Sequence, residues 1–237
     1  MARRATLLFA YGQSNDLIFA ADSRAMSSTG FLHSDSERKL VVIGPRGVCA
    51  IGGYCDGTIK TGPRVGWHWK LIDAFASIPQ LPTRSASDRA SAVFAAAYNS
   101  AFEYMQHDTD EGIPGVCSNG ITILYGEVSK MGNLSFYRAD MPVEISELGS
   151  GWKWSVQPPI FKEIFPGTPQ HALPFVYYHN PEIIQPTEFQ IPPDDKRVLD
   201  GIEKLFAAYS QHAPGNTVGG KVAVIRVSNS GARWINA

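Results

Sequence analysis

Residues suited to amide-bond chemistry stand within the first 53 positions of the chain: Thr6, an Asp-Ser-Arg run that begins at Asp22, Lys39, and a glycine pair that ends at Gly53. A threonine hydroxyl is a weak nucleophile unless a base lies beside it, and the α-amine of an N-terminal threonine supplies such a base. A nearby lysine would favour the neutral amine and the developing alkoxide, and an aspartate would hold that lysine charged and in place. A backbone N–H at a glycine turn could receive an oxyanion.

Each of these residues begins or ends a short apolar stretch. Apolar runs with turn signals between them are typical of meandering strands. The sequence predicts turns at 12–16 and 44–45, and strands over 6–11, 17–24, 39–43 and 48–53. Because the reactive residues stand at the ends of these strands, we expect them to gather in one site.

The order and spacing of these residues resemble the N-terminal segment of proteasome β-type subunits, which belong to the N-terminal-nucleophile (Ntn) hydrolase superfamily. In that family a threonine opens the first strand, Ala-Ala-Asp-Ser-Arg lies on the second, a lysine starts the third and Gly-Gly closes the fourth. The counterparts here are Thr6, residues 20–24, Lys39 and residues 52–53. The spacing up to the aspartate matches without a gap, and the lysine is displaced by one residue.

Two later stretches, Gly149-Ser150-Gly151 and residues 218–226, also resemble the family, so the resemblance covers most of the chain apart from about 152–193. It implies that Thr6 is the nucleophile and amine base, that Lys39 and Asp22 are its charged neighbours, and that Gly53 donates to the oxyanion. Ser150 would lie near the amine as a hydrogen-bond partner. It further implies a peptide or small amide substrate and a homo-oligomer, since relatives of this fold stack into rings.

Departures from the family pattern bear on activity. Thr6 is not N-terminal as encoded, so residues 1–5 would have to be removed, and the preceding residue is Ala5 where self-cleaving relatives usually have glycine. The acid and serine that the family places before its C-terminal Gly-Gly are replaced by Gly215 and Val218. The residues between them, Asn-Thr at 216–217, could donate or accept hydrogen bonds but carry no charge.

Each candidate also has an interpretation without catalysis. Thr6 could be an ordinary β-branched strand residue, and residues 22–24 could form a surface ion pair or a loop cap. Lys39 could be a solvated charge, and residues 52–53 could simply make a turn. Ser150 could be a generic loop serine. Two function classes therefore stay open. One is a threonine-type Ntn hydrolase, and the other is a catalytically inactive Ntn-fold structural subunit of a homo-oligomeric assembly.

The composition limits the partners and the compartment. A formal charge of −1 over 237 residues gives no reason to expect nucleic acid or an anionic membrane as partner. The N-terminus has no long apolar run, which predicts neither a signal peptide nor a membrane span. Three cysteines without metal spacing are typical of reduced thiols, which predicts a cytoplasmic protein. The six histidines also lack metal spacing, and no cofactor is indicated.

The remaining periodicity predicts helices over 63–75, 87–105 and 194–211, with Ser87 as the cap of the second. Further strands are expected over 121–125, 134–138, 143–148, 221–226 and 233–235. Residues 152–193 are rich in proline and aromatic residues and lack a sustained period, so we expect an ordered insertion packed over the body. The pattern indicates an α+β class, and the resemblance implies a four-layer αββα sandwich of one Ntn hydrolase-like domain over residues 1–237.

Overall fold

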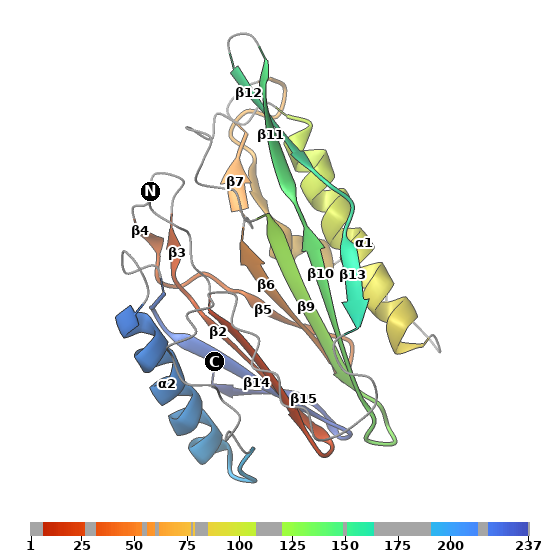
Figure 1. Ribbon diagram of the computed structural model, residues 1–237, viewed down its shortest axis with the longest axis vertical. Helices are drawn as coiled ribbons and strands as arrows, with labels where there is room; N and C mark the ends of the chain where they lie inside the picture. The colour runs from red at the N-terminus through yellow and green to blue at the C-terminus, as the bar shows by residue number, and fades with distance from the viewer. Residues whose placement is uncertain are drawn as a thin grey trace.

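The computed structural model of the chain describes residues 7–26, 32–53, 56–59, 62–76, 78, 85–107, 120–148, 151–163, 191–212 and 218–236. Within these ranges the chain forms two main antiparallel β-sheets, three short two-stranded pairs and two α-helices (Figure 1). The predicted α+β class is therefore confirmed.

The first sheet joins the two ends of the chain. Its strands, in spatial order, are β1 (Leu8–Gln13), β2 (Asp16–Asp22), β14 (Val222–Ser228) and β15 (Gly231–Asn236). The β1–β2 hairpin pairs Leu8 with Ala21, and β14 pairs with β2 from Val222 opposite Asp22. The N-terminal and C-terminal hairpins thus lie side by side, and the last residue of β2 meets the first residue of β14.

The second sheet has the order β13 (Ile160–Glu163), β10 (Leu134–Met141), β9 (Ile121–Val128), β6 (Gly47–Gly53) and β5 (Leu40–Ile43). Its central strand β9 is buried along its whole length. A strand covered on both faces needs no alternation of apolar and polar residues, which explains why the sequence here reads as an apolar run.

Short strand pairs extend from these sheets: β3 (Ala25–Met26) with β4 (Leu32–Ser34), β7 (Asp56–Thr58) with β8 (His68–Lys70), and β11 (Val143–Leu148) with β12 (Gly151–Val156). The prediction of a helix over 63–75 is wrong for the first half of that range. Gly62 and Gly66 adopt positive φ and turn the chain, so that β8 forms and only the 3-10 helix η1 (Leu71–Phe75) follows.

The N-cap of helix α1 (Ala86–Met105) lies two residues before the predicted cap, Ser87. Ser85 is the N-cap, because its hydroxyl accepts from the Asp88 N–H while the Asp88 side chain accepts from the Ser85 N–H. The buried face of the helix includes Phe94 and Tyr104, whereas Phe102 is 45% exposed.

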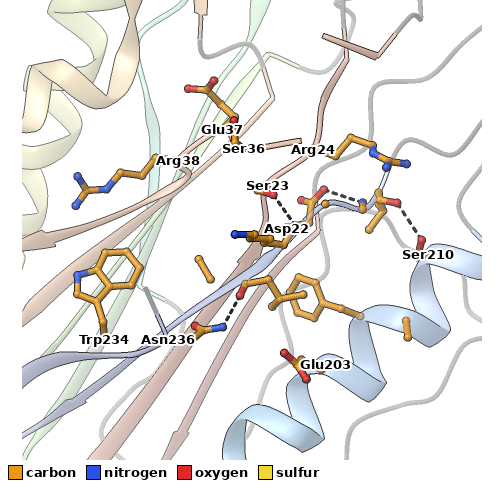
Figure 2. A pocket seen from close by; sticks show the side chains of 18 residues that line it. Asp22, Ser23, Arg24, Ser36, Glu37, Arg38, Glu203, Ser210, Trp234 and Asn236 are labelled. Carbon is orange, nitrogen blue, oxygen red and sulfur yellow. Dashed lines mark hydrogen bonds between the residues drawn. The ribbon is translucent and has the colours of Figure 1, made fainter. Parts of the chain in front are cut away.

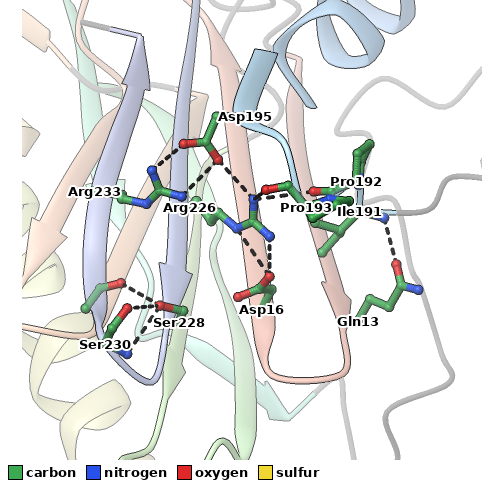
Figure 3. Close-up of polar contacts among 11 residues, drawn as sticks. Gln13, Asp16, Ile191, Pro192, Pro193, Asp195, Arg226, Ser228, Ser230 and Arg233 are labelled. Carbon is green, nitrogen blue, oxygen red and sulfur yellow. Dashed lines mark hydrogen bonds and ion pairs between the residues drawn. The ribbon is translucent and has the colours of Figure 1, made fainter. Parts of the chain in front are cut away.

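Helix α2 (Asp195–His212) is anchored at its N-terminus by a buried arginine of β14 (Figure 3). The Arg226 guanidinium lies between the carboxylates of Asp16 and Asp195, and it also donates to the carbonyl of Pro193 at 3.1 Å. Arg233 of β15 contacts Asp195 as well. These contacts fix the start of α2 against the first sheet.

Apolar side chains form three clusters that relate the helices and sheets. One joins α1 to the second sheet, with Phe94 and Tyr125 among its members. Another joins α2 to the first sheet through Phe9 and Phe206. The third contains residues of both sheets, such as Phe19 of β2. In Figure 1 each helix accordingly covers the outer side of its own sheet, and the two sheets face each other.

The insertion predicted over 152–193 is wrong for its first residues, which belong to strands. Residues 151–156 pair with β11, and residues 160–163 pair with β10 as the edge strand β13. All four residues of β13 are exposed, so its own sequence shows no buried face to reveal it. Residues 191–193 lead into α2, and residues 164–190 lie outside the described part of the chain.

Candidate active site

A buried ion pair lies where β2 ends and β5 begins. Asp22 is the last residue of β2, and Lys39 immediately precedes β5. The Lys39 Nζ lies 2.8 Å from Asp22 Oδ1, and the two side chains are only 3% and 1% exposed. The pair therefore joins the end of the first sheet to the edge of the second.

Backbone groups complete the surroundings of the pair. Asp22 Oδ1 also accepts from the Leu7 N–H at 3.0 Å, and Oδ2 accepts from the Gly219 N–H at 3.2 Å. The Lys39 ammonium donates to the Arg24 carbonyl at 2.6 Å. An ammonium has three N–H donors, and no residue in the described ranges takes the third.

The energetics of such a pair differ from those of a surface pair. Removing two charges from water is costly, and attraction offsets this cost only when further hydrogen bonds satisfy both groups. Asp22 meets that condition with three donors from three separate segments of the chain. The interpretation of residues 22–24 as a surface ion pair is therefore wrong for Asp22, and the interpretation of Lys39 as a solvated charge is wrong as well.

The segment after α2 is fastened to the same strand end. The Arg24 N–H donates to the Gly219 carbonyl at 3.0 Å, and the Lys221 N–H donates to the Ser23 hydroxyl at 2.7 Å. Gly220 has φ +73°, and a Cβ there would lie 2.4 Å from the Ser23 hydroxyl oxygen. Only glycine permits this approach, which brings the Gly219 N–H to Asp22.

An exposed ion pair supports this fastening. The Arg24 guanidinium chelates Asp35, with Nε–Oδ1 at 2.6 Å and the second bond at 2.9 Å. Hydrogen bonding to Asp35 raises the pKa of Arg24, and the same bond holds the pKa of the Asp35 carboxyl below its ordinary value. The charged pair keeps the Arg24 backbone in place, and with it the carbonyl that receives the Lys39 ammonium.

Gly53 ends β6 with φ +87°, and a Cβ there would lie 2.1 Å from the Gly120 carbonyl oxygen. Any other residue would clash with backbone, so glycine is required at this position. The Ile51 N–H, two residues earlier, donates to the Lys39 carbonyl at 2.9 Å. Gly53 is therefore only two residues along the chain from Ile51, which contacts Lys39 directly.

Comparisons with known proteins give a fold. No protein-family model matches the chain, and no curated protein matches it. Among solved structures, an Anbu Gly-1 mutant from Hyphomicrobium sp. strain MC1 superimposes with a TM-score of 0.57 at 12% identity, over 98% of this chain and 88% of that one. Anbu from Yersinia bercovieri, described as an ancestral beta-subunit, gives a TM-score of 0.58 at 13% identity, over 97% of this chain and 87% of that one.

The chain has a fold similar to that of Anbu. This finding corrects the identification of the chain as a proteasome β-type subunit-like protein, because no family model matches the chain and the two solved structures named above are Anbu proteins. At 12–13% identity the likeness to Anbu concerns the fold alone. What the site does must therefore be argued from its own residues.

The structure describes some of the predicted site residues and not others. Asp22 and Lys39 are in contact, and Gly53 lies at the end of the neighbouring strand. Thr6 and Ser150 lie outside the described residues, as does Gly215. Val218, which takes the place of the family's serine, is buried and belongs to the apolar cluster under α2.

Sequence reasoning missed the backbone donors and acceptors of the site. The Leu7 and Gly219 N–H groups and the Arg24 carbonyl carry no side-chain signal. One signal could have indicated the role of Gly219. It belongs to a glycine pair just before an apolar strand, and glycine at such a place often marks a close approach of backbone segments.

In the described ranges no three His, Cys, Asp or Glu side chains are grouped so that they could hold a metal ion. The same ranges contain no helix with the length and apolar character needed to cross a membrane.

Proposed function

We propose that this protein is a threonine-type Ntn hydrolase that cleaves peptide or other amide bonds once Thr6 is exposed as the N-terminal residue. The observation that carries this proposal is the buried Lys39–Asp22 pair, whose carboxylate also binds the Leu7 N–H. These two bonds keep the Lys39 ammonium within roughly 6 Å of the Leu7 nitrogen. Thr6 is the residue bonded to that nitrogen, and this supports the proposal that Lys39 is the cation beside the nucleophile.

The proposed chemistry gives each group a defined role. The Thr6 hydroxyl attacks the substrate carbonyl carbon and its proton passes to the Thr6 α-amine, which ordinarily titrates at a pKa of about 7.7–8.0. Lys39, held charged by Asp22, favours the neutral amine and stabilises the alkoxide. The Gly53 N–H receives the oxyanion, and Ser150 binds the amine. The amine returns the proton to the leaving group, and water then hydrolyses the acyl-enzyme.

Support for this arrangement comes from the free donor of Lys39. Two of its three N–H groups are taken by Asp22 and the Arg24 carbonyl, and the third has no partner among the described residues. A buried donor without a partner is unfavourable, which favours a further acceptor at this place. We propose that the acceptor is the Thr6 hydroxyl.

The test is the mass of the intact purified protein. The hydrolase requires a mature chain that starts at Thr6, and T6A should retain residues 1–5 and lose amidase activity. K39M should also lose activity, whereas R64M, at an exposed arginine of an unrelated ion pair, should be processed and active. If wild type and T6A retain the same N-terminus and share any residual activity, the proposal fails.

The alternative is a catalytically inactive Ntn-fold structural subunit. The observation that favours it is Val218, whose buried side chain can neither donate nor accept a hydrogen bond where the family has serine. Ala5 before Thr6 points the same way, because alanine is less free than glycine to adopt a strained bond. Under this alternative, purified wild type keeps residues 1–5.

The architecture and assembly belong to the same proposal. We propose one Ntn hydrolase-like domain over residues 1–237 with four αββα layers, cytoplasmic and homo-oligomeric, without nucleic acid or membrane as partner. A monomeric mass by light scattering at micromolar concentration would remove the oligomer from the proposal.

A further inference from the structure

A cavity of about 940 Å³ opens between α2, the start of β14 and the end of β15 (Figure 2). This volume is in the range of sites that hold small organic molecules. Its walls come from five segments: residues 22–24, residues 36–38, the α2 residues 203–210, residues 218–223 and residues 234–236. Asp22 of the buried ion pair is among the described lining residues, whereas Lys39 and Gly53 are not.

The inner surface of the cavity is largely apolar. The apolar side chains that line it are those of Phe206, Ala207, Val218, Val222, Ala223 and Trp234. The Arg38 guanidinium carbon lies 5.5 Å from the centre of the Trp234 ring. An apolar surface with an aromatic ring on one wall suits a ligand with a flat, apolar body.

The polar groups of the wall are mostly committed within the protein. The Asn236 amide binds the backbone of β14, with Nδ2 at 2.7 Å from the Val222 carbonyl and Oδ1 at 2.8 Å from the Val224 N–H. The Ser210 hydroxyl donates to the Val218 carbonyl at 3.0 Å. These groups give the cavity its shape and leave recognition to the charged side chains.

After the ion pairs are set aside, the wall of the cavity has more cationic than anionic side chains. Asp22 is neutralised by Lys39. Arg24 is neutralised by Asp35, and Glu37 is neutralised by Lys70 at 3.0 Å. Arg38 and Lys221 remain, and neither has a carboxylate partner in the described ranges, where Arg38 donates only to the Leu40 carbonyl. Glu203 on α2 is the acid that remains against these two cations.

In Figure 2, Arg38 and Trp234 lie across the cavity from α2 with Glu203 and Ser210. Arg38 and Lys221, which have no carboxylate partner among the described residues, come from segments other than the helix, and Glu203 comes from the helix. The same cavity is lined by Phe206 and Trp234.

We propose that this cavity is a binding site for a small organic anion, a molecule with a flat apolar body and one carboxylate. Arg38 and Lys221 bind the carboxylate, and the body lies between Trp234 and Phe206. Arginine suits this role because its planar guanidinium can bind a carboxylate through two parallel hydrogen bonds. None of these four residues belongs to the proposed reaction, so their substitution tests this site separately from the proposed hydrolase.

The test uses 2-naphthoate as probe, with 2-naphthamide as its neutral counterpart, in calorimetric titrations of the full chain. We expect saturable binding of one naphthoate per chain, at least about fivefold tighter than the amide. R38Q and K221Q should each weaken naphthoate binding about fivefold or more and leave amide binding unchanged, whereas E203Q should leave naphthoate binding unchanged or strengthen it.

Two variants serve as controls for position and for shape. R64Q removes another arginine that lies over a tryptophan, 5.4 Å from the Trp67 ring, and should not change naphthoate binding. A207W places a large side chain in the cavity from an exposed helix position and should abolish binding of both probes. Unchanged thermal unfolding verifies that A207W is folded, and K221Q at an exposed position provides the test should R38Q fail to fold.

Several results would overturn the proposal. Equal affinity for naphthoate and naphthamide would show that no cation recognises the anion. Undiminished binding in R38Q and K221Q together, or in folded A207W, would place the probe elsewhere. Absence of saturable naphthoate binding at roughly millimolar concentration would also refute the site.

Discussion

Replacing Lys39 by methionine should cost the protein about 3 kcal/mol of unfolding free energy, because it leaves a carboxylate in a place where only 1% of the Asp22 side chain is exposed. Removing one partner of a buried pair typically costs about 3–5 kcal/mol. We expect the lower end here, since the Leu7 and Gly219 N–H groups continue to donate to Asp22. The loss is measured by urea unfolding followed by tryptophan fluorescence, with the slope m compared between variants.

A double-mutant cycle separates the pair from its surroundings. D22N alone leaves the ammonium buried with one carbonyl acceptor, and should also cost about 3 kcal/mol. The double variant D22N/K39M buries no charge at these positions, so its cost should fall short of the sum of the single costs by at least about 2 kcal/mol.

The exposed pair of Arg64 and Glu103 provides the matched control. Their side chains are 49% and 58% exposed at an N–O distance of 2.7 Å, and R64M and E103Q should each cost less than about 1 kcal/mol. If the buried and exposed pairs give the same small and additive losses, the description of Asp22 and Lys39 as a buried, interdependent pair is refuted.

Other consequences can be measured on the same protein. Burial and the neighbouring Glu127 carboxylate raise the pKa of Tyr125 above its ordinary value of 10.0, so the folded state holds this proton more tightly. This contribution to stability is full below about pH 10 and falls above it, and Y125F should therefore show a shallower decline in stability between about pH 10 and pH 12. G220A should destabilise by about 2 kcal/mol or more because its Cβ would lie 2.4 Å from a serine hydroxyl, whereas G44A, with φ +61° and open space around it, should cost only about 1 kcal/mol. Burial raises the pKa of the Cys49 thiol well above its ordinary value, so peptide mapping should find Cys49 unlabelled by a thiol reagent in native protein and labelled in urea.

The sequence predicted elements well where one residue type dictates a local structure. Helix α1 and the turns at 12–16 and 44–45 could be predicted because the helical period and the turn residues act over short separations in the chain. The contact of Asp22 with Lys39 was expected from the family spacing, and the two side chains do meet at 2.8 Å. Their part in catalysis stays a prediction.

Other features could not be predicted because their causes lie far apart in the chain. The Gly219 N–H reaches Asp22 across 197 positions, and no local pattern encodes this contact. Strand β13 has no buried face of its own and forms because β10 offers an open edge. The helix expected over 63–75 failed because the positive φ of Gly62 and Gly66 outweighs the apolar spacing.

The carboxylate of Asp22 has donors at positions 7, 39 and 219, so these donors are synthesised at different times as the polypeptide grows. The ribosome releases the N-terminal third early, yet the anion acquires its last partner only when β14 arrives to pair with β2. A chain that stops before residue 219 has both charges of the pair but lacks one of the three donors to Asp22. The carboxylate that holds Lys39 is therefore fully hydrogen-bonded only when this late segment has folded against the end of β2.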